Sequence, residues 1–363
     1  MTIYSIDSHK VEQNIQTLQR KAGVPLIAVV KNNGYGLGLE WLAKTTRDAG
    51  ITQFAITELA DIAPLRETVG NDADILMLRS TALYEELKVI MENNCIATIG
   101  SSAAARALDL TAQRLGIQAR AHLKVDTGLG RYGFAPQKPQ TIASCFSLDG
   151  LRIEGIYSHF SDASDLNHPE TSAQELASFK QCVTSLQDRG FDTGIRHMAN
   201  SAGLFNVPNS ALDAVRIGSG FTGRIITREE NRLQRIGVLE SAVIDLKHFP
   251  KGSSLGYHGT YRTKRDTLAA IVPIGTQDGF SLQVTPQPRF HQVLSTAKQC
   301  VLRKHATVAI EGVDYPILGV VDMSLYMVDV TDQPAHIGDR ATADINPLMV
   351  NPRVLRIYQN DRA

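Results

Sequence analysis

The chain has 363 residues, 43% of them hydrophobic and 20% charged, a composition typical of a globular protein large enough for a barrel or for two domains. Its 37 basic and 37 acidic residues leave no net charge, which argues against nucleic acid or an anionic membrane surface as a partner. No apolar stretch approaches the roughly 20 residues of a membrane helix.

The segment MTIYSIDSHKVEQN at the N-terminus becomes polar after a few residues and lacks the apolar core of a secretory signal, so we expect a cytoplasmic protein. The cysteines have neither paired metal-ligand spacing nor the density of a disulfide framework. We therefore expect reduced, structural thiols and no metal site. The cysteines are Cys95, Cys145, Cys182 and Cys300.

Eight short apolar segments recur in the first two thirds of the chain, most of them separated by segments with helical apolar spacing, such as LEWLAKTTRDAG. This alternation predicts a parallel sheet covered by helices. Eight repeats favour a (β/α)8 TIM-type barrel over residues 1–228, with an open doubly wound sheet as the alternative. The predicted strands are 25–30, 52–57, 74–79, 95–100, 121–126, 152–160, 195–200 and 213–218.

The pattern changes after residue 228. Segments of branched or alternating residues, joined by Gly, Pro and Asp turns, replace the helical spacing. We expect strands at 238–249, 267–275, 306–321, 324–330 and 339–345. Residues 229–363 are therefore predicted to form a C-terminal all-β domain.

Lys31, in AVVKNNGYGLGLEW, directly follows the first predicted barrel strand. Ligand-binding side chains of such barrels stand at the carboxyl ends of the strands. Burial of its stem would lower the pKa of Lys31 and leave a free amine for nucleophilic attack or proton transfer. A lysine there is also compatible with a plain ion pair at the barrel mouth. Gly34, Gly36 and Gly38 suit a turn that passes close to a ligand, or turn geometry alone.

Polar residues follow four of the other predicted strands. Small and hydroxyl residues after the seventh and eighth strands lie where barrels commonly bind phosphate, although Ser201 is equally suited to a helix N-cap and Gly218 to a turn. An aldehyde-reactive lysine beside a phosphate site suggests pyridoxal 5'-phosphate (PLP). The residues are Lys124, Asp126 and Arg131, then His159, then His197, Asn200 and Ser201, then Arg216, Gly218 and Ser219.

Six motifs resemble, in order and spacing, those of the alanine racemase family of fold-type III PLP enzymes. They are KNNGYG, KVDTGLGRYGF, SHF, NSAG, VRIGSG and SLGYHGTY. The resemblance covers nearly the whole chain. It implies a PLP-dependent racemase that interconverts L- and D-amino acids, with an amino acid as its small-molecule substrate.

The resemblance also implies roles for single residues. Lys31 would form the Schiff base, Arg216 would face the pyridine nitrogen with His159 orienting it, and Arg131 would lie near the phenolic oxygen and the substrate carboxylate. Lys124 matches a lysine that this family can carbamylate, a modification the sequence does not decide. The remaining cofactor-binding residues would be Tyr35, Asn200, Ser201, Gly218 and Ser219.

Racemisation needs an acid and a base on opposite faces of Cα. Lys31 would serve one face, and the resemblance assigns the other to Tyr257 of the partner subunit, which implies a head-to-tail homodimer with shared sites. Met323 matches a partner-contributed methionine whose backbone amide meets the substrate carboxylate. Without the resemblance, Tyr257 and Met323 would be interpreted as packing residues.

The chain departs from the family pattern near the expected entrance and phosphate site. A gate tyrosine is replaced by Thr276, followed by Gln277, an aspartate by Ser324, and a phosphate-binding tyrosine by Pro352. A wider channel relaxes the exclusion of larger side chains. Alanine is the substrate that the family implies, and serine, ornithine and lysine are the alternatives.

Two other functions remain open. A fold-related decarboxylase of basic amino acids would need a three-glycine phosphate loop and a catalytic cysteine, which the surroundings of Cys300 do not provide. A PLP carrier without turnover would not need the all-β domain with Tyr257. Both are weaker hypotheses than a racemase.

Overall fold

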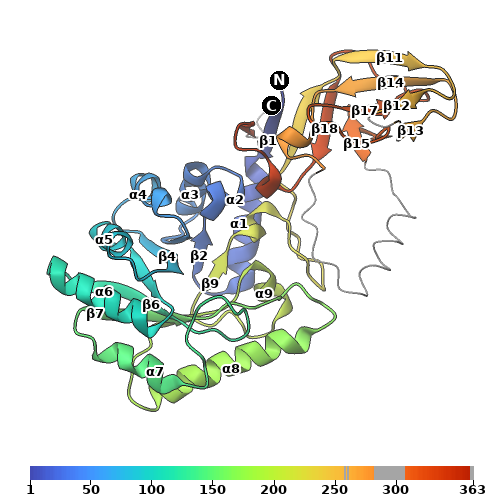
Figure 1. The fold of residues 1–363 in the computed structure, drawn as a ribbon. Coiled ribbons are helices and arrows are strands. Elements are labelled where there is room, and N and C mark those ends of the chain that lie inside the picture. Colours follow the sequence, from blue (N-terminus) through green and yellow to red (C-terminus); the bar gives the residue numbers. More distant parts are fainter. Residues whose placement is uncertain (257–258, 260, 282–306, 360–363) are drawn as a thin grey trace. The chain divides into compact units, whose positions relative to one another are not determined.

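The computed structural model describes residues 1–256, 259, 261–281 and 307–359. Contacts divide the chain into two compact units, His9–Arg235 and Met1–Ser8 together with Ile236–Ala363, each of which is described by itself below (Figure 1). Tyr257 and Cys300 lie outside the described residues. Within the described part, no helix combines the length and the apolarity needed to cross a membrane.

The first unit contains an eight-stranded parallel sheet, as the sequence predicts. Its strand order is β8-β7-β6-β5-β4-β3-β2-β9, and a bridge between His197 and Ala214 joins the two ends of that order into a barrel. The strands are β2 (Leu26–Val29), β3 (Gln53–Ile56), β4 (Asp74–Ser80), β5 (Ile96–Ile99), β6 (Ala119–Lys124), β7 (Leu151–Tyr157), β8 (Ile195–His197) and β9 (Val215–Ile217).

Helices separate the strands and cover the outside of the barrel, so that strands such as β2 and β5 are buried along their whole length. Burial on both faces explains their continuous apolar sequences. The helices are α1 (Ser8–Ala22), α2 (Lys31–Tyr35), α3 (Leu39–Asp48), α4 (Ile62–Val69), α5 (Tyr84–Glu92), α6 (Ser102–Leu115), α7 (Pro139–Ala143), α8 (Pro169–Gln187) and α9 (Ser201–Asn206).

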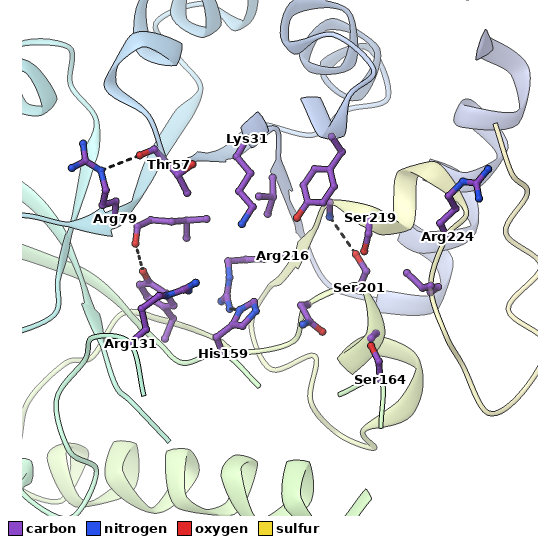
Figure 2. A pocket seen from close by; sticks show the side chains of 18 of the residues that line it. Lys31, Thr57, Arg79, Arg131, His159, Ser164, Ser201, Arg216, Ser219 and Arg224 are labelled. Atoms are coloured by element: carbon purple, nitrogen blue, oxygen red, sulfur yellow. Dashed lines mark hydrogen bonds between the residues drawn. The ribbon is translucent and has the colours of Figure 1, made fainter. Parts of the chain in front are cut away.

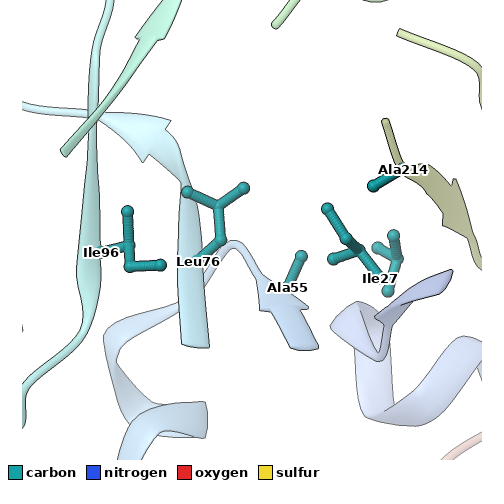
Figure 3. Close-up of a cluster of buried hydrophobic side chains, with 6 residues drawn as sticks. Ile27, Ala55, Leu76, Ile96 and Ala214 are labelled. Carbon is teal, nitrogen blue, oxygen red and sulfur yellow. The ribbon is translucent and has the colours of Figure 1, made fainter. Parts of the chain in front are cut away.

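A cluster of apolar side chains fills part of the barrel (Figure 3). Tyr35 and Leu78 pack against this cluster while remaining partly exposed. The cluster therefore supports side chains at the carboxyl ends of the strands, where the sequence analysis places the site. Its members are Ile27, Val29, Ala55, Leu76, Ile96 and Ala214.

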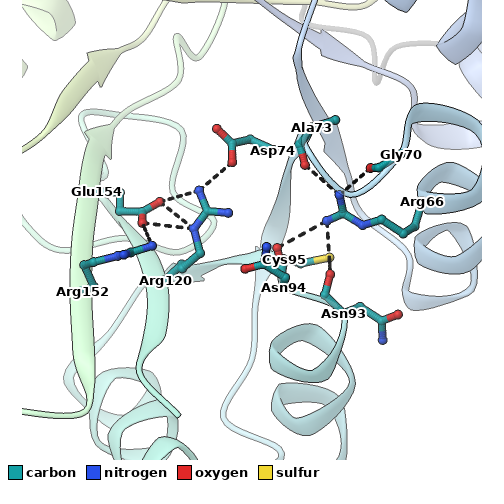
Figure 4. A network of polar contacts seen from close by, with 10 residues as sticks. All are labelled: Arg66, Gly70, Ala73, Asp74, Asn93, Asn94, Cys95, Arg120, Arg152 and Glu154. Atoms are coloured by element: carbon teal, nitrogen blue, oxygen red, sulfur yellow. Dashed lines mark hydrogen bonds and ion pairs between the residues drawn. The ribbon is translucent and has the colours of Figure 1, made fainter.

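Ion pairs link the strands β4, β6 and β7 toward the opposite end of the barrel, across the intervening strand β5 (Figure 4). Arg120 in β6 binds Asp74 in β4 at 2.6 Å and Glu154 in β7 at 2.8 Å. Glu154 also pairs with Arg152 at 2.5 Å. Nearby, Arg66 donates to four backbone carbonyl oxygens, of Gly70, Ala73, Asn93 and Asn94.

The second unit is rich in β-strands, as expected for the C-terminal region. A six-stranded sheet has the order β16-β15-β18-β10-β1-β19, and a three-stranded sheet has the order β11-β14-β17. The strands are β1 (Ile3–Asp7), β10 (Gly237–Ala242), β11 (Asp245–Phe249), β12 (Ser254–Leu255), β13 (Tyr261–Arg262), β14 (Thr267–Val272), β15 (Thr307–Ile310), β16 (Val313–Pro316), β17 (Tyr326–Asp329), β18 (Arg340–Asp344) and β19 (Leu355–Gln359).

The N-terminal strand differs from the sequence-based division, which counts residues 1–228 with the barrel. β1 pairs antiparallel with β10 and parallel with β19, so it belongs to the β-rich unit. Gly237 allows this close pairing, because a Cβ atom there would lie 2.6 Å from the carbonyl oxygen of Ser5. Buried Tyr4 and Ile6 then add to the core of the sheet.

Replacing Arg120 tests the ion-pair network. Arg120→Met leaves the carboxylates of Asp74 and Glu154 partly buried without this partner, and we expect it to lower the free energy of unfolding by about 1–2 kcal/mol, between the values typical of exposed and of buried pairs. Trp41, the single tryptophan of the chain, lies in α3 and reports barrel unfolding by fluorescence in denaturant.

Lys44→Met is the matched control, because Lys44 pairs with Asp48 on an exposed helix surface. It should change the unfolding free energy much less. Equal losses in the two variants would show that the Arg120 network adds nothing beyond an ordinary surface pair.

Candidate active site

A cavity of about 480 Å³ lies at the carboxyl ends of the barrel strands (Figure 2). All nine residues predicted to bind the cofactor line it, although they come from distant parts of the sequence. They are Lys31, Tyr35, Arg131, His159, Asn200, Ser201, Arg216, Gly218 and Ser219.

The turn that follows Lys31 is left-handed. Asn32, Asn33, Gly34 and Tyr35 have φ values between 51° and 61°. Asparagine and glycine tolerate this conformation better than other residues, which explains the sequence KNNGYG. A Cβ atom on Gly34 would also lie 3.2 Å from the backbone nitrogen of Leu39. The glycines therefore serve both the backbone conformation and a close approach to α3.

Tyr35 is a bulky residue held at a positive φ of 55°. Such a conformation costs about 1–3 kcal/mol and persists only where the surroundings enforce it. The turn directs the Tyr35 ring against Gly218, where a Cβ atom would lie 2.3 Å from the ring. Burial raises the pKa of the Tyr35 hydroxyl, which therefore stays protonated and able to donate at neutral pH.

The side chain of Lys31 lines the cavity. Burial lowers the pKa of its ammonium group, and the positive charges of Arg131 and Arg216 lower it further. Both effects disfavour the protonated form and make the amine more nucleophilic at neutral pH.

Arg216 is almost fully buried, with 3% of its surface exposed. Its NH2 group donates to the carbonyl oxygens of Ser158 at 2.6 Å and Met198 at 3.1 Å, and lies 3.1 Å from Nδ1 of His159. Its NH1 group lies 2.5 Å from Nδ1 of His197 and 3.2 Å from the carbonyl oxygen of the same residue. These contacts use the terminal nitrogens, so the Nε–H remains for a ligand in the cavity.

The two histidines beside Arg216 are neutral. Burial lowers the pKa of both His159 and His197 well below the usual value, and the charge of Arg216 lowers them further. A neutral imidazole accepts a hydrogen bond at one nitrogen, whereas an imidazolium accepts none. Both rings can therefore accept from Arg216, whose own pKa burial lowers to about 10, so that it remains a cation at neutral pH.

The side chain of Lys124 is also buried, with 2% of its surface exposed. It donates to the carbonyl oxygen of Val125 at 2.6 Å, and its Nζ lies 5.5 Å from the centre of the Tyr157 ring. The guanidinium of Arg216 lies 4.9 Å from the same ring. Burial and the charges of Arg216 and Arg131 outweigh the nearby carboxylates and lower the pKa of Lys124 to about 7.

Ser201 and the segment after β9 form a compact polar corner of the cavity. The Ser201 hydroxyl oxygen accepts from the backbone N–H groups of Gly218 at 3.2 Å and Gly220 at 3.0 Å, which leaves its own O–H free to donate (Figure 2). Asn200 caps α9 by accepting from the N–H of Gly203 at 2.8 Å. Ser201 and Asn200 thus have structural contacts in addition to their place at the cavity.

The cavity has an unbalanced charge. Among the described residues, its lining contains six lysine and arginine side chains and no aspartate or glutamate. An anionic ligand would offset this charge, and the donors match a phosphate, a phenolate oxygen and a carboxylate. Among the described residues, no group of histidine, cysteine and carboxylate side chains could hold a metal ion. The cations are Lys31, Arg79, Lys124, Arg131, Arg216 and Arg224.

Two predicted site residues are not part of this cavity as described. Tyr257 lies outside the described residues, and Met323 belongs to the β-rich unit, where 74% of its surface is exposed. Gln277 donates its N–H to the carbonyl oxygen of Met323 at 2.9 Å, and Asn351 donates to the carbonyl oxygen of Gln277 at 2.9 Å. These bonds bring together the segments that carry the unusual residues Thr276, Gln277, Ser324 and Pro352.

Several residues that line or support the cavity have no role predicted from sequence. Tyr157 lies two positions before His159, and period-two spacing along a strand could have indicated that both face the interior. His197 was named as a strand-end residue without a role. Arg79 lies within the third barrel strand, β4, and binds Glu86 at 3.1 Å, a pairing that no motif indicates.

The expected thiols are present where the structure describes them. Cys95, Cys145 and Cys182 are free and buried. Burial raises the pKa of Cys145 and Cys182 to about 11, so neither is a ready thiolate.

The chain matches two family descriptions in succession. Residues 6–225 match "Alanine racemase, N-terminal domain" and residues 236–345 match "Alanine racemase, C-terminal domain". An alanine racemase of Methanococcus maripaludis is 30% identical over 346 residues, which cover 93% of this chain and 87% of that protein. One of Symbiobacterium thermophilum is 32% identical over 340 residues, covering 92% and 85%.

Solved structures of similar proteins share the fold. The biosynthetic alanine racemase of Pseudomonas aeruginosa has a TM-score of 0.83 and 25% identity over 99% of both chains. The alanine racemase of Bartonella henselae, described with covalently bound pyridoxal phosphate, has a TM-score of 0.83 and 23% identity over 99% of both chains. The chain belongs to the alanine racemase family and is an alanine racemase-like enzyme, an isomerase.

Proposed function

We propose that this protein interconverts L- and D-alanine with PLP as its cofactor. The observation that carries the proposal is the cavity in which Lys31, with a lowered pKa, stands near the buried cation Arg216 and no carboxylate contributes to the lining. The names of the relatives support alanine as the substrate and the Bartonella protein's description supports PLP.

The residues of the cavity fit this cofactor. Lys31 would bind it covalently, and the Ser201 hydroxyl with Tyr35, Asn200, Gly218 and Ser219 would hold the phosphate. The Nε–H of Arg216 would donate to the pyridine nitrogen, with His159 orienting the guanidinium. Arg131 would lie near the phenolic oxygen and bind the substrate carboxylate.

PLP, when bound, supplies an electron sink that makes the Cα proton of an amino acid removable. Arg216 would donate a hydrogen bond to the pyridine nitrogen and keep its proton, because an arginine in contact with carbonyl oxygens and neutral imidazoles stays a cation at neutral pH. By leaving that nitrogen unprotonated, Arg216 would favour return of the proton to Cα. Lys31 would move the proton on one face of Cα.

Tyr257 of the partner subunit would move the proton on the other face, in a head-to-tail homodimer with shared sites. Two groups are required, because a single group that returns its own proton regenerates the starting enantiomer. Met323 of the partner subunit would meet the substrate carboxylate through its backbone amide.

A larger amino acid is the second candidate substrate. Thr276 and Ser324 are smaller than the tyrosine and aspartate of the family pattern, and the hydrogen bonds of Gln277 to neighbouring segments bring the altered positions together. Serine, ornithine and lysine are therefore to be tested beside alanine.

Chiral chromatography after incubation of the protein and PLP with each L-amino acid tests the function. We expect the D-enantiomer of alanine to form, and Lys31→Ala to lower the rate by at least about 10²–10⁴-fold, the usual contribution of a positioned general acid or base. The visible absorbance of the protein-bound Schiff base should also disappear.

The other outcomes each contradict alanine racemisation in a distinct way. Racemisation of serine, ornithine or lysine, without racemisation of alanine, would show that the larger amino acid is the substrate. Release of CO2 would indicate a decarboxylase. Failure to exchange the Cα proton for deuterium with every amino acid would indicate a PLP carrier.

Shared active sites predict complementation between two inactive variants. Lys31→Ala and Tyr257→Phe should each abolish most activity, whereas coexpression of the two should restore it, because one site of each mixed dimer keeps both residues. The rate is measured on mixed dimers purified through two different tags. If mixed dimers form and stay as inactive as the two parents, the lysine and the tyrosine act within one subunit and the shared site is wrong.

The rate of PLP uptake should depend on pH through Lys31. Only the neutral amine reacts, and its pKa is lowered, so uptake should reach half its maximum below the pH expected for a free lysine. Arg131→Gln removes a nearby cation, raises the pKa of Lys31 and shifts the midpoint to higher pH. Stopped-flow absorbance with cofactor-free protein measures the midpoint.

Arg79→Gln is the matched control for this shift. Arg79 lines the same cavity but is not among the causes of the lowered pKa of Lys31. Its midpoint should stay at the wild-type pH. Equal shifts in both variants would contradict a specific effect of Arg131.

A further inference from the structure

A second histidine lies behind the one that contacts Arg216. Nε2 of His197 is 3.0 Å from Nδ1 of His122, and both rings are buried inside the barrel. The ring centres are 5.1 Å apart. Arg216, His197 and His122 thus form a continuous chain of hydrogen bonds that begins at the cavity and ends below it.

The network determines which nitrogen of each ring carries the proton. Arg216 has only donors, so Nδ1 of His197, at 2.5 Å, must accept. Burial keeps His197 neutral, and its proton is therefore on Nε2. Nε2 then donates to Nδ1 of His122, whose own proton must be on Nε2. Burial lowers the pKa of His122 to about 3, so this ring is neutral as well.

The backbone makes room for His122 at this position. The pairing of β6 with β7 shifts register after Ala121, so that Glu154 is an extra residue and Gly155 comes to lie opposite His122. A Cβ atom on Gly155 would lie 2.8 Å from Nε2 of His122. A bulge and a glycine together therefore accommodate the ring.

His122 is costly to bury, because its Nε2 atom has no hydrogen-bond partner among the described residues. An apolar side chain would avoid this cost. Within the part of the chain that the structure describes, the one hydrogen bond of the ring is with His197, through Nδ1. The position of His122 is thus explained by that contact and by no other polar interaction of its own.

We infer that His122 is a positioning residue for Arg216: it holds His197 in the tautomer that accepts from the guanidinium. The inference rests on the proposed function for its effect on catalysis, and on the hydrogen-bond geometry and burial of the two rings for the tautomer. Without an acceptor at this position, Nε2–H of His197 is buried without a partner, so that only the contact with Arg216 still favours the observed tautomer and the tautomer with the proton on Nδ1 costs less than in the wild type. In that tautomer, the N–H at Nδ1 of His197 would face the N–H groups of Arg216. Their repulsion would move the guanidinium away from the position in which it can contact the cofactor.

Displacement of Arg216 changes the outcome of the reaction. Without the hydrogen bond from Arg216, bound PLP would be a stronger electron sink, which would favour transamination over return of the proton to Cα. The net side reaction would convert amino acid and PLP into keto acid and pyridoxamine phosphate, with the amino group moving to the cofactor and the aldehyde oxygen replaced through water. The ratio of keto acid to racemised product reports this event.

Two substitutions at His122 separate the acceptor from the packing. His122→Leu removes the acceptor, whereas His122→Asn keeps an oxygen close to the place of Nδ1. For His122→Leu we expect about a tenfold fall in kcat, at the lower end of what partners of functional histidines contribute, with little change in KM and a higher keto acid ratio. His122→Asn should remain near the wild-type rate and ratio.

Nitrogen NMR of the full chain with ¹⁵N-labelled histidine tests the tautomer without reference to activity. In cofactor-free protein, His197 should carry its proton on Nε2 in the wild type and in His122→Asn, and lose this preference in His122→Leu. An unchanged tautomer in His122→Leu overturns the inference, even if the protein racemises no amino acid. Equal kinetic losses in both variants also overturn it, because they indicate packing.

Gly155→Ala is an independent variant that leaves both histidines in place. Its methyl group would push the His122 ring away from its position, so the keto acid ratio should rise as in His122→Leu. Ile156→Val, in the same strand, is the control for simple destabilisation and should leave the ratio unchanged. A ratio that rises equally in the control, or in neither variant, contradicts the positioning role.

Discussion

Arg216 carries a positive charge inside the barrel with no carboxylate within hydrogen-bonding distance among the described residues. Removing a charge from water costs several kcal/mol unless other groups replace the hydration. Here the carbonyl oxygens of Ser158, His197 and Met198, two neutral imidazoles and the face of Tyr157 take that role. The ends of β7 and β8 are shaped by this requirement, because their backbones must turn three carbonyl groups toward one side chain.

The choice of acceptors has a chemical consequence. A carboxylate beside Arg216 would neutralise it and leave little field at the cavity. Carbonyl and imidazole groups solvate the cation without neutralising it, so its charge still acts on Lys31 and Lys124, whose pKa values it helps to lower. Burial is the main cause of both shifts, and the charge of Arg216 adds to it. The same field makes the cavity attractive to a ligand with several negative charges.

Local sequence patterns predicted much of the fold and part of the site. Continuous apolar segments indicated all eight barrel strands, and their order placed Lys31, Arg131 and Arg216 around one cavity. The strand β1 was missed, because it is a short strand that joins a sheet formed mostly by residues after 236, and nothing nearby in the sequence indicates this pairing. The left-handed turn after Lys31 was visible only as a group of glycine and asparagine residues.

The roles of the buried histidines were beyond a sequence argument for a different reason. His122 lies within an apolar strand, where a single histidine is indistinguishable from a packing residue until its partner, 75 positions later, is known. Thr276 and Gln277 likewise gain meaning only from contacts with distant segments. The period-two pattern of a strand predicts which face of the sheet a residue occupies. The tautomer of a buried histidine depends instead on which side chain its ring contacts, here the ring of His197.

The bulge in β7 connects the two polar systems of the barrel. Glu154 is the extra residue, and its carboxylate completes the ion pairs with Arg120 and Arg152 away from the cavity. The same insertion moves Gly155 opposite His122 and makes room for the ring below Arg216. The ion pairs at Glu154 therefore stabilise the local backbone on which the histidine chain depends. The ion pairs of Glu154 with Arg120 and Arg152 thus help to hold the backbone below Arg216, the cation that is expected to face the ligand.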